Sequence, residues 1–203
     1  AYVGALLTIT QKPITVTADN KSKTYGDADP GLTYQVTAGA LEGGDAFSGA
    51  ITRAAGENAN TYAITQDTLS AGANYALTFV PGTFTINLRA ITVTADAKGK
   101  TYGADAGDPA LTYQLTSGTL AAGDALSGAL SRVAGEDVGM YAITEGSLAV
   151  GPVRGRTGGN YDLTYVGALL TISQKAITVT ADAKTKTYGD ADPALTYQVT
   201  VGS

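Results

Sequence analysis

The hexapeptide ITVTAD occurs three times in the chain, starting at Ile14, Ile91 and Ile177. Consecutive starts lie 77 and 86 residues apart. Self-similarity at a period of tens of residues indicates several copies of one small domain, each of which packs mainly against its neighbours. The chain is therefore expected to fold as a tandem array rather than around one central core.

The copies align along nearly their whole length, which sets the predicted domain boundaries. Residues 32–69 match residues 111–148 without a gap, and the second copy is longer because two residues are added within YGADAGDP and seven within VGPVRGRTGG. We expect the natural protein to continue with further copies. The predicted segments are 1–13, the final strand of a truncated preceding repeat; 14–90, a complete first repeat; 91–176, a complete second repeat with a loop insertion at 150–159; and 177–203, the first part of a following repeat.

Each copy is predicted to be an all-β domain. The stretches ITVTA, LTYQV, TYAIT, YALTF and TFTIN alternate apolar and polar residues, which is the period of a strand with one face in the core. Short strands separated by Gly, Asp and Asn turns favour a small β-sandwich or a β-grasp-like sheet. The predicted inward residues of the first repeat are Ile14, Val16, Leu32, Tyr34, Val36, Tyr62, Ile64, Tyr75, Leu77, Phe79, Phe84 and Ile86.

Only one stretch in each repeat suggests a helical turn. It is GGDAFSGA in the first repeat and AAGDALSGA in the second, where Asp45 or Asp124 would cap the free amides. At the junctions, about four polar residues separate the last strand of one repeat from the first strand of the next. Because so short a connection is no flexible tether, we expect small β domains, with at most one short helical turn each, arranged as a semi-rigid rod.

Composition excludes several classes of chemistry. The chain has no histidine, cysteine or tryptophan, so imidazole bases, thiol nucleophiles, Cys/His zinc sites and disulfides are ruled out. A net charge of −5 argues against a nucleic-acid partner, and no apolar run approaches the ~20 residues that span a membrane. Neither a Gly-x-Ser-x-Gly motif nor a phosphate-binding loop is present. We therefore expect no enzyme, no nucleic-acid binding and no membrane insertion.

The octapeptide KTYGDADP at residues 23–30 returns unchanged at 186–193 and is the most conspicuous motif. Its two carboxylates, Asp27 and Asp29, together with Asp19, are candidate calcium ligands, since calcium takes six to eight oxygens. The second repeat instead reads YGADAGDP, with Asp105 and Asp108 three residues apart. This change of spacing argues against a conserved coordination sphere and against a catalytic carboxylate pair.

The alternative interpretation of the motif is a structural turn made by Tyr25, Gly26, Asp27, Asp29 and Pro30. Glycine supports a positive φ, aspartates accept hydrogen bonds from nearby amides, and proline restricts the entry to the next strand. A turn also tolerates two inserted residues. We favour the turn, expect no cofactor, and keep calcium as the alternative.

Three further groups of charged residues recur or stand out. Arg53 and Arg132 each precede a glutamate at the same offset, in AGEN and AGED, which predicts a surface ion pair or, alternatively, a ligand-binding pair. Lysines such as Lys23 raise the hypothesis of Lys–Asn isopeptide bonds, but their positions beside turns favour solvation. The inserted loop carries Arg154 and Arg156, a candidate contact loop that is alternatively a neutral insertion.

The series ITVTADxKxKTYGDADPxLTYQVT, GDAxSGAxxRxAGExxxxYAIT and NYxLTYVGALLTI resembles the YGX-type MBG repeats that occur in tandem in bacterial surface adhesins and haemagglutinin-like exoproteins. The resemblance covers essentially the whole chain. It implies an extracellular protein, on a bacterial cell surface or in a secreted fibre, in which such units form a stalk, matrix or filament. It transfers no ligand-binding residues.

These observations lead to two functional hypotheses. The favoured one is a structural segment of a long bacterial adhesin, whose partners are the neighbouring repeats of the same chain. The alternative is a multivalent binding module for a host glycan or another cell surface. We also consider self-association, in which the incomplete segments 1–13 and 177–203 donate strands to a neighbour.

Overall fold

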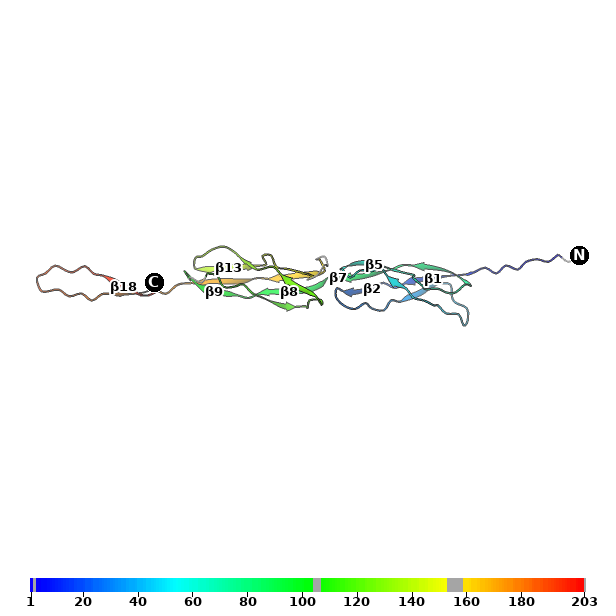
Figure 1. Ribbon diagram of the computed structural model, residues 1–203, viewed down its shortest axis with the longest axis horizontal. Coiled ribbons are helices and arrows are strands. Elements are labelled where there is room, and N and C mark those ends of the chain that lie inside the picture. Colours follow the sequence, from blue (N-terminus) through cyan, green and yellow to red (C-terminus); the bar gives the residue numbers. More distant parts are fainter. Residues whose placement is uncertain (2, 104–106, 153–158, 203) are drawn as a thin grey trace. The chain divides into compact units, whose positions relative to one another are not determined.

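The computed structural model describes residues 1–203 apart from 2, 104–106, 153–158 and 203 (Figure 1). Every regular element in this described part is a β-strand, and the strands fall into small separate sheets within the tandem repeats. The prediction of tandem all-β domains is therefore confirmed. No helix that could span a membrane occurs among the described residues.

The first repeat contains β1 (Lys12–Ala18), β2 (Lys21–Thr24), β3 (Tyr34–Ala38), β4 (Thr52–Arg53), β5 (Asn60–Thr65), β6 (Tyr75–Val80) and β7 (Gly82–Asn87). The second contains β8 (Arg89–Ala95), β9 (Lys98–Thr101), β10 (Tyr113–Ser117), β11 (Asp124–Ser127), β12 (Ser131–Arg132), β13 (Gly139–Thr144), β14 (Ala149–Pro152), β15 (Tyr161–Val166) and β16 (Ala168–Ser173). The remaining strands are β17 (Thr178–Ala181) and β18 (Tyr197–Val201). The first strands β1 and β8 thus begin two residues ahead of ITVTAD.

Each complete repeat contains one three-stranded and one four-stranded sheet, and the second repeat has in addition the two-stranded sheet β11-β14. In the first repeat the orders are β3-β1-β6 and β2-β7-β5-β4, and in the second they are β10-β8-β15 and β9-β16-β13-β12. The central strand β1 runs antiparallel to β3 and parallel to β6, while β7 runs antiparallel to β5 and parallel to β2. Two separate sheets indicate a sandwich rather than a single β-grasp sheet.

The core of the first repeat lies between its two sheets. Ala18 of β1 and Phe79 of β6 pack with Ile64 and Phe84 from the opposite sheet. The predicted inward residues are buried or half-buried, except Val36, which is 43% exposed. Val36 pairs with buried Val16, but it lies on the edge strand β3, where the sheet covers only one side of the side chain.

The predicted helical turn is wrong in both repeats. In the second repeat this stretch forms strand β11, which pairs with β14, and in the first Ser48 and Ser70 form an isolated bridge. The aspartates expected to cap a helix have another role. Asp45 and Asp124 accept hydrogen bonds from the Tyr75 and Tyr161 hydroxyls at 2.6 and 2.7 Å, so their carboxylates are occupied by side chains rather than by helix amides.

The first residues of the chain also differ from the strand expected for them. Residues 3–11 lie outside any strand, although their sequence repeats that of β16. The partners of β16 are β13 and β9, both of which precede it within its own repeat. A strand of this type therefore depends on segments that come before it.

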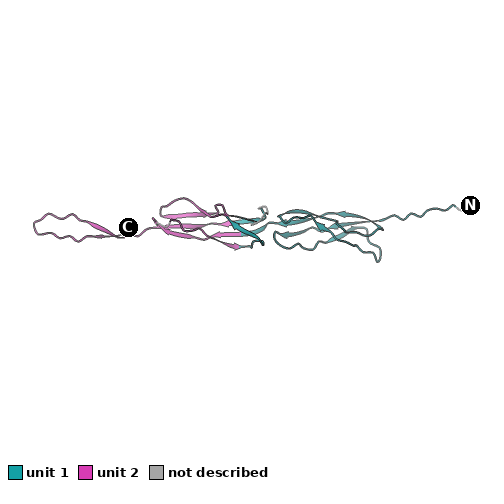
Figure 2. Ribbon diagram, viewed as in Figure 1, with its two compact units in different colours: residues 1–91, 117–127, 149–164 teal, residues 92–116, 128–148, 165–203 magenta. Residues whose placement is uncertain are grey.

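The chain divides into two compact units whose boundary does not follow the sequence repeats (Figure 2). The first unit comprises residues 1–91 together with 117–127 and 149–164, and the second comprises the remaining residues. Two segments of the second repeat thus belong to the same compact unit as the first repeat. These two segments contact Tyr25 of the Tyr-Gly motif, and this contact determines the role of the motif.

Candidate functional site

The motif KTYGDADP begins in β2 and turns immediately after it. The Asp27 amide donates to the Thr24 carbonyl at 3.0 Å, and the Tyr25 amide donates to the Asn87 carbonyl at 2.9 Å. Gly26 has a φ of 84°, a conformation that side chains other than glycine rarely adopt. The turn presents the Tyr25 ring to the interior, where only 1% of the residue is exposed.

Residues of the second repeat complete the burial of Tyr25. Its ring meets the Tyr161 ring edge to face, with centroids 5.4 Å apart and planes at 74°. Ala121, 8% exposed, belongs to the same apolar cluster. At the other two copies of the motif, Tyr102 is 47% exposed and Tyr188 is fully exposed. The tyrosine of the motif is thus deeply buried in the copy that is covered by a following repeat.

We call this contact the joint. On the side of the first repeat it consists of Tyr25, Gly26, Asp27, Asn58 and Ala59, and on the side of the second repeat it consists of Arg89, Thr119, Ala121, Asn160 and Tyr161. All of these residues lie in the first compact unit.

Gly26 is required at the joint for space as well as for its φ. A Cβ built on Gly26 would lie 2.5 Å from the Ala121 Cβ, closer than real Cβ atoms approach. The equivalent Gly103 also has a positive φ, 68°, yet nothing lies within 4 Å of its Cβ position. The glycine therefore serves the turn in both repeats and, at the joint, also the approach of Ala121.

Arg89, the first residue of β8, binds the turn through two groups and the second repeat through a third. Its Nε donates to the Tyr25 carbonyl at 2.7 Å, and its Nη2 forms an ion pair with the Asp27 carboxylate. Its Nη1 donates to the Thr119 hydroxyl at 3.1 Å. The side chain is 18% exposed, so the guanidinium is largely shielded from water and links the turn to the second repeat.

Asn160 provides the second polar contact and is itself 4% exposed. Its side-chain oxygen accepts from the Ala59 amide at 2.8 Å, and its side-chain nitrogen donates to the Asn58 side-chain oxygen at 3.2 Å. The Asn160 carbonyl accepts from the Arg89 amide at 3.0 Å. Because a buried amide without partners would be costly, these bonds hold Asn160 against Asn58 and Ala59 within the first compact unit.

The Tyr161 hydroxyl holds the Ala121 segment in place. It accepts from the Ala121 amide at 2.8 Å and donates to Asp124 at 2.7 Å. Burial, followed by the hydrogen bond to Asp124, raises the pKa of Tyr161 to about 12. The phenol thus remains protonated throughout the neutral range and keeps donating to the carboxylate.

A second cluster lies beside the turn and joins four charged side chains. Lys23 Nζ lies 2.7 Å from Asp29 and 2.6 Å from Glu57, while Arg53 lies 2.5 Å from both of these carboxylates. The cations are the buried members, with Lys23 side chain 5% and Arg53 side chain 10% exposed. We call this the four-charge network. The second repeat repeats it with Lys100, Asp108, Arg132 and Glu136.

The network shifts the acids toward the charged form. Hydrogen bonding to Arg53, then to Lys23, lowers the pKa of Asp29, and hydrogen bonding to Lys23 is the largest cause of the lowered pKa of Glu57. Two inserted residues do not displace the carboxylate, since Asp108 binds Lys100 and Arg132 just as Asp29 binds their equivalents.

The simpler expectation for AGEN was a surface ion pair, but the side chain of Arg53 is largely buried. Its guanidinium lies over the Tyr62 and Phe84 rings, 5.5 and 4.9 Å from their centroids, and donates to the Ala54 and Gly56 carbonyls. Sequence reasoning missed Lys23 and Asp29 as its partners in the network. The signal was available, because lysine, aspartate, arginine and glutamate keep the same order in both repeats.

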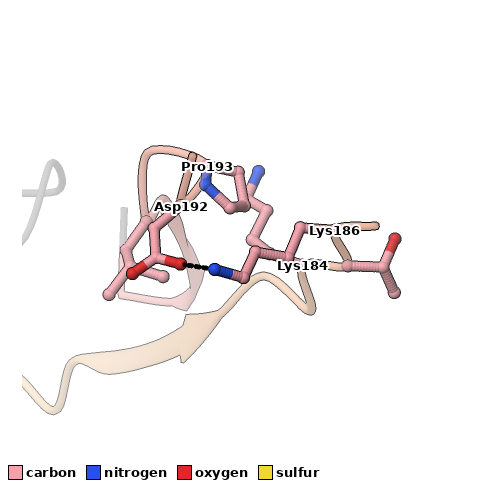
Figure 3. Close-up of a pocket in the computed structure, with 6 residues that line it drawn as sticks. Lys184, Lys186, Asp192 and Pro193 are labelled. Atoms are coloured by element: carbon pink, nitrogen blue, oxygen red, sulfur yellow. Dashed lines mark ion pairs between the residues drawn. The ribbon is translucent and has the colours of Figure 1, made fainter. Parts of the chain in front are cut away.

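The third copy of the motif shows the lysine–aspartate part of the network alone (Figure 3). Lys186 and Asp192 form an ion pair at 2.5 Å, with side chains 45% and 86% exposed. The positions equivalent to Arg53 and Glu57 fall beyond residue 203. The open cavity of about 300 Å³ beside this pair is lined by Lys184, Thr185, Lys186, Asp192, Pro193 and Leu195.

The three aspartates considered as calcium ligands have different partners. Asp19 accepts from the Thr33 hydroxyl at 2.5 Å, Asp27 pairs with Arg89, and Asp29 belongs to the four-charge network. Within the described part of the chain, no group of three acidic side chains that could hold a metal ion is found. The candidate contact loop with Arg154 and Arg156 lies outside the described residues.

An isopeptide bond at Lys23 is chemically disfavoured by the same network. A Lys–Asn bond forms when a neutral lysine amine attacks the carboxamide of an asparagine and ammonia leaves, a step that a neighbouring protonated acid assists. Burial alone would lower the pKa of Lys23, but its hydrogen bonds to Asp29 and Glu57 outweigh burial and raise it. The arginine meanwhile lowers the pKa of Asp29. The ion pair is therefore the stable state.

Comparison with known proteins adds one finding. The model of the MBG domain (YGX type) matches residues 14–85, 91–171 and 177–202. No curated protein and no solved structure matches the chain.

Proposed function

Because the chain belongs to the MBG domain family of the YGX type, we propose that it is a structural segment of a bacterial extracellular adhesin. In this role successive repeats form a stalk, matrix or filament that gives length, stiffness and surface presentation. The observation that carries the proposal is the joint, in which the Tyr25 of one repeat is buried by residues of the next. The family characteristically occurs in adhesin-like repeat proteins, which supports the extracellular setting.

Stiffness follows from how the joint is made. A single residue, Leu88, separates β7 from β8, so the connection has almost no freedom of its own. The apolar contact at Tyr25 and the polar contacts of Arg89 act on the turn, and those of Asn160 act on a second part of the first repeat, at Asn58 and Ala59. A hinge motion would break all of them together.

The proposal assigns no catalytic step to this segment. The carboxylates of the motif are paired with arginine or lysine, and this pairing lowers the pKa of Asp29 instead of bringing it near neutrality. General acid–base catalysis at neutral pH needs the opposite shift. The residues are thus used as fixed charges that hold loops together.

Backbone ¹⁵N relaxation of the 203-residue chain tests the stiffness. β5 lies in the first repeat and β13 in the second. If the joint is rigid, the amides of both strands report the same anisotropic rotational diffusion. Separate, faster tumbling of the two repeats would contradict the proposal. Immunogold labelling of the full-length protein on intact cells tests the location, and label confined to the cell interior would equally contradict it. Micromolar affinity of the isolated segment for a glycan would favour the binding-module alternative.

A further inference from the structure

The faces that the two repeats turn toward a preceding repeat differ at several positions, and two of these differences concern charged side chains. We call the face of a repeat that is turned toward the preceding repeat its proximal face. In the second repeat it carries Arg89 and Ala121, which take part in the joint. In the first repeat the equivalent residues are Lys12 and Glu42. Since the repeats are so similar elsewhere, this difference bears directly on which repeats can dock.

The proximal faces of both repeats nevertheless share two backbone hydrogen bonds. The Glu42 amide donates to the Tyr75 hydroxyl at 2.7 Å, as the Ala121 amide does to Tyr161 at 2.8 Å. The Lys12 amide likewise donates to the Asn74 carbonyl at 2.9 Å, the counterpart of the bond between Arg89 and Asn160. Glu42 therefore projects from the place that Ala121 occupies at the joint.

The first repeat satisfies its proximal charges internally. Lys12 Nζ and Glu42 form an ion pair within the repeat, with side chains 42% and 72% exposed. In the second repeat, alanine at position 121 leaves Arg89 without an acidic partner at that position, and Arg89 pairs across the joint with Asp27. The same basic position thus binds its own repeat in one case and the preceding repeat in the other.

The surroundings of Ala121 are unsuited to a carboxylate. An open cavity of about 280 Å³ at the joint is lined by Tyr25, Gly26, Asp27, Glu57, Ala121 and Ala122. Two carboxylates, those of Asp27 and Glu57, therefore line the same cavity as Ala121. A glutamate there would meet like charge and would also compete with Asp27 for Arg89.

We propose that the residue pair at positions 89 and 121 determines which repeat docks on a Tyr-Gly-Asp turn. A proximal face with arginine and alanine accepts the turn, whereas one with lysine and glutamate is neutralised internally and rejects it. The partner of the second repeat's proximal face is thus specified as a preceding repeat with an acidic Tyr-Gly-Asp turn. This inference rests on the proposed structural function, because it concerns the order of repeats in the array.

The test uses the full 203-residue chain with Ala121→Glu. Because the chain has no cysteine, spin labels can be attached at Ala63→Cys and Ala142→Cys, two equivalent exposed positions in the two repeats. Pulsed electron spin resonance then measures the width of the inter-label distance distribution. We expect a narrow distribution for the parent protein and a broad one for Ala121→Glu, with the docked population reduced about tenfold or more.

Two matched variants separate charge from size and from general damage. Ala121→Gln has nearly the same volume without the charge and is expected to stay mostly docked. Ala97→Glu adds the same charge at an exposed position away from the joint and is expected to behave like the parent. At 1 M salt, where the screening length falls to ~3 Å, the Ala121→Glu distribution should narrow again. Far-UV circular dichroism verifies that each variant retains its strands.

The outcomes separate this inference from the proposed function. A broad distribution in the parent protein would refute the stiff segment itself. A narrow parent with an equally narrow Ala121→Glu would refute only the selection of repeats. Equal broadening by Ala121→Gln and Ala121→Glu would refute selection by charge, as would a glutamate effect that salt leaves unchanged.

Discussion

Replacing Tyr25 by alanine should weaken the first repeat far more than the same change at the other copies of the motif. Tyr25, Tyr102 and Tyr188 occupy the same motif position, but they are 1%, 47% and 104% exposed. The three substitutions therefore remove the same atoms from three different degrees of burial. Their comparison isolates what the following repeat contributes.

The expected magnitudes follow from the buried area. A fully buried tyrosine removes ~150–250 Å² from water, which at ~25 cal/mol per Å² amounts to ~4–6 kcal/mol as an upper bound. Large-to-alanine changes in protein cores cost about 3–5 kcal/mol, and we expect this for Tyr25→Ala. Tyr102→Ala, with about half the burial, should cost about 2 kcal/mol. Tyr188→Ala should remain within ~0.5 kcal/mol of the parent.

Hydrogen exchange measured by mass spectrometry provides the assay, because it assigns the free energy of opening to each repeat separately. The informative peptides contain β7 and β16, whose last residues Asn87 and Ser173 accept hydrogen bonds from the Tyr25 and Tyr102 amides. Tyr25→Ala should lower protection in β7 and also in the segment around Ala121. Tyr102→Ala should affect β16 alone.

Equal losses of protection for Tyr25→Ala and Tyr102→Ala would refute the reasoning. The stabilisation by the tyrosine would then arise within its own repeat, and its burial by Ala121 and Tyr161 would contribute nothing measurable. The same conclusion would follow if Tyr25→Ala left the protection around Ala121 unchanged, since a joint that stabilises one side must stabilise the other.

Three further predictions concern the same region. Arg53 lowers the pKa of Asp29, so the stability that this ion pair contributes is present above about pH 4 and is lost as the pH falls through the lowered pKa. In Arg53→Gln the thermal midpoint should therefore decline less steeply between about pH 4 and pH 2. An unchanged slope would contradict this prediction. In both Gly26→Ala and Gly103→Ala an alanine must adopt a left-handed conformation, at a cost of about 1–2 kcal/mol. Only Gly26→Ala also forces Ala121 away. The distribution of distances between spin labels on the two repeats should therefore broaden for Gly26→Ala and stay unchanged for Gly103→Ala. Millimolar calcium or a chelator should leave the thermal midpoint within 1 °C or so, as the three candidate aspartates are held by separate partners; a rise of many degrees would restore the calcium hypothesis.

The repeated all-β architecture was predictable from sequence because it depends on local alternation. Each strand needs only a period of two to direct its side chains, and residues such as Ile64 and Phe84 follow that rule. Val36 does not, since its exposure depends on lying at a sheet edge, which is a property of strand order. The misassigned helical turn has a similar origin: Asp45 is bound by Tyr75, a residue 30 positions away.

The joint was not predictable from the sequence of a single repeat. Its residues are ordinary types that lie far apart in the sequence, such as Asn58 and Asn160, which are 102 positions apart. A pattern search identifies the Tyr-Gly turn, but the turn is formed within one repeat, whereas its burial is completed by another. The differences between Lys12 and Arg89 and between Glu42 and Ala121 are local signs that the proximal faces of the two repeats are not equivalent.

Each joint is encoded half in one copy and half in the next, and this has a genetic consequence. Unequal crossing-over between homologous repeats changes the number of copies, and every such event creates a new pairing of a turn with a proximal face. An exchange that places a face like that of Ala121 behind a Tyr-Gly-Asp turn keeps the array continuous. An exchange that places a face like that of Glu42 behind such a turn introduces a junction that does not dock. Changes in copy number are then selected through the compatibility of neighbouring repeats as well as through length itself.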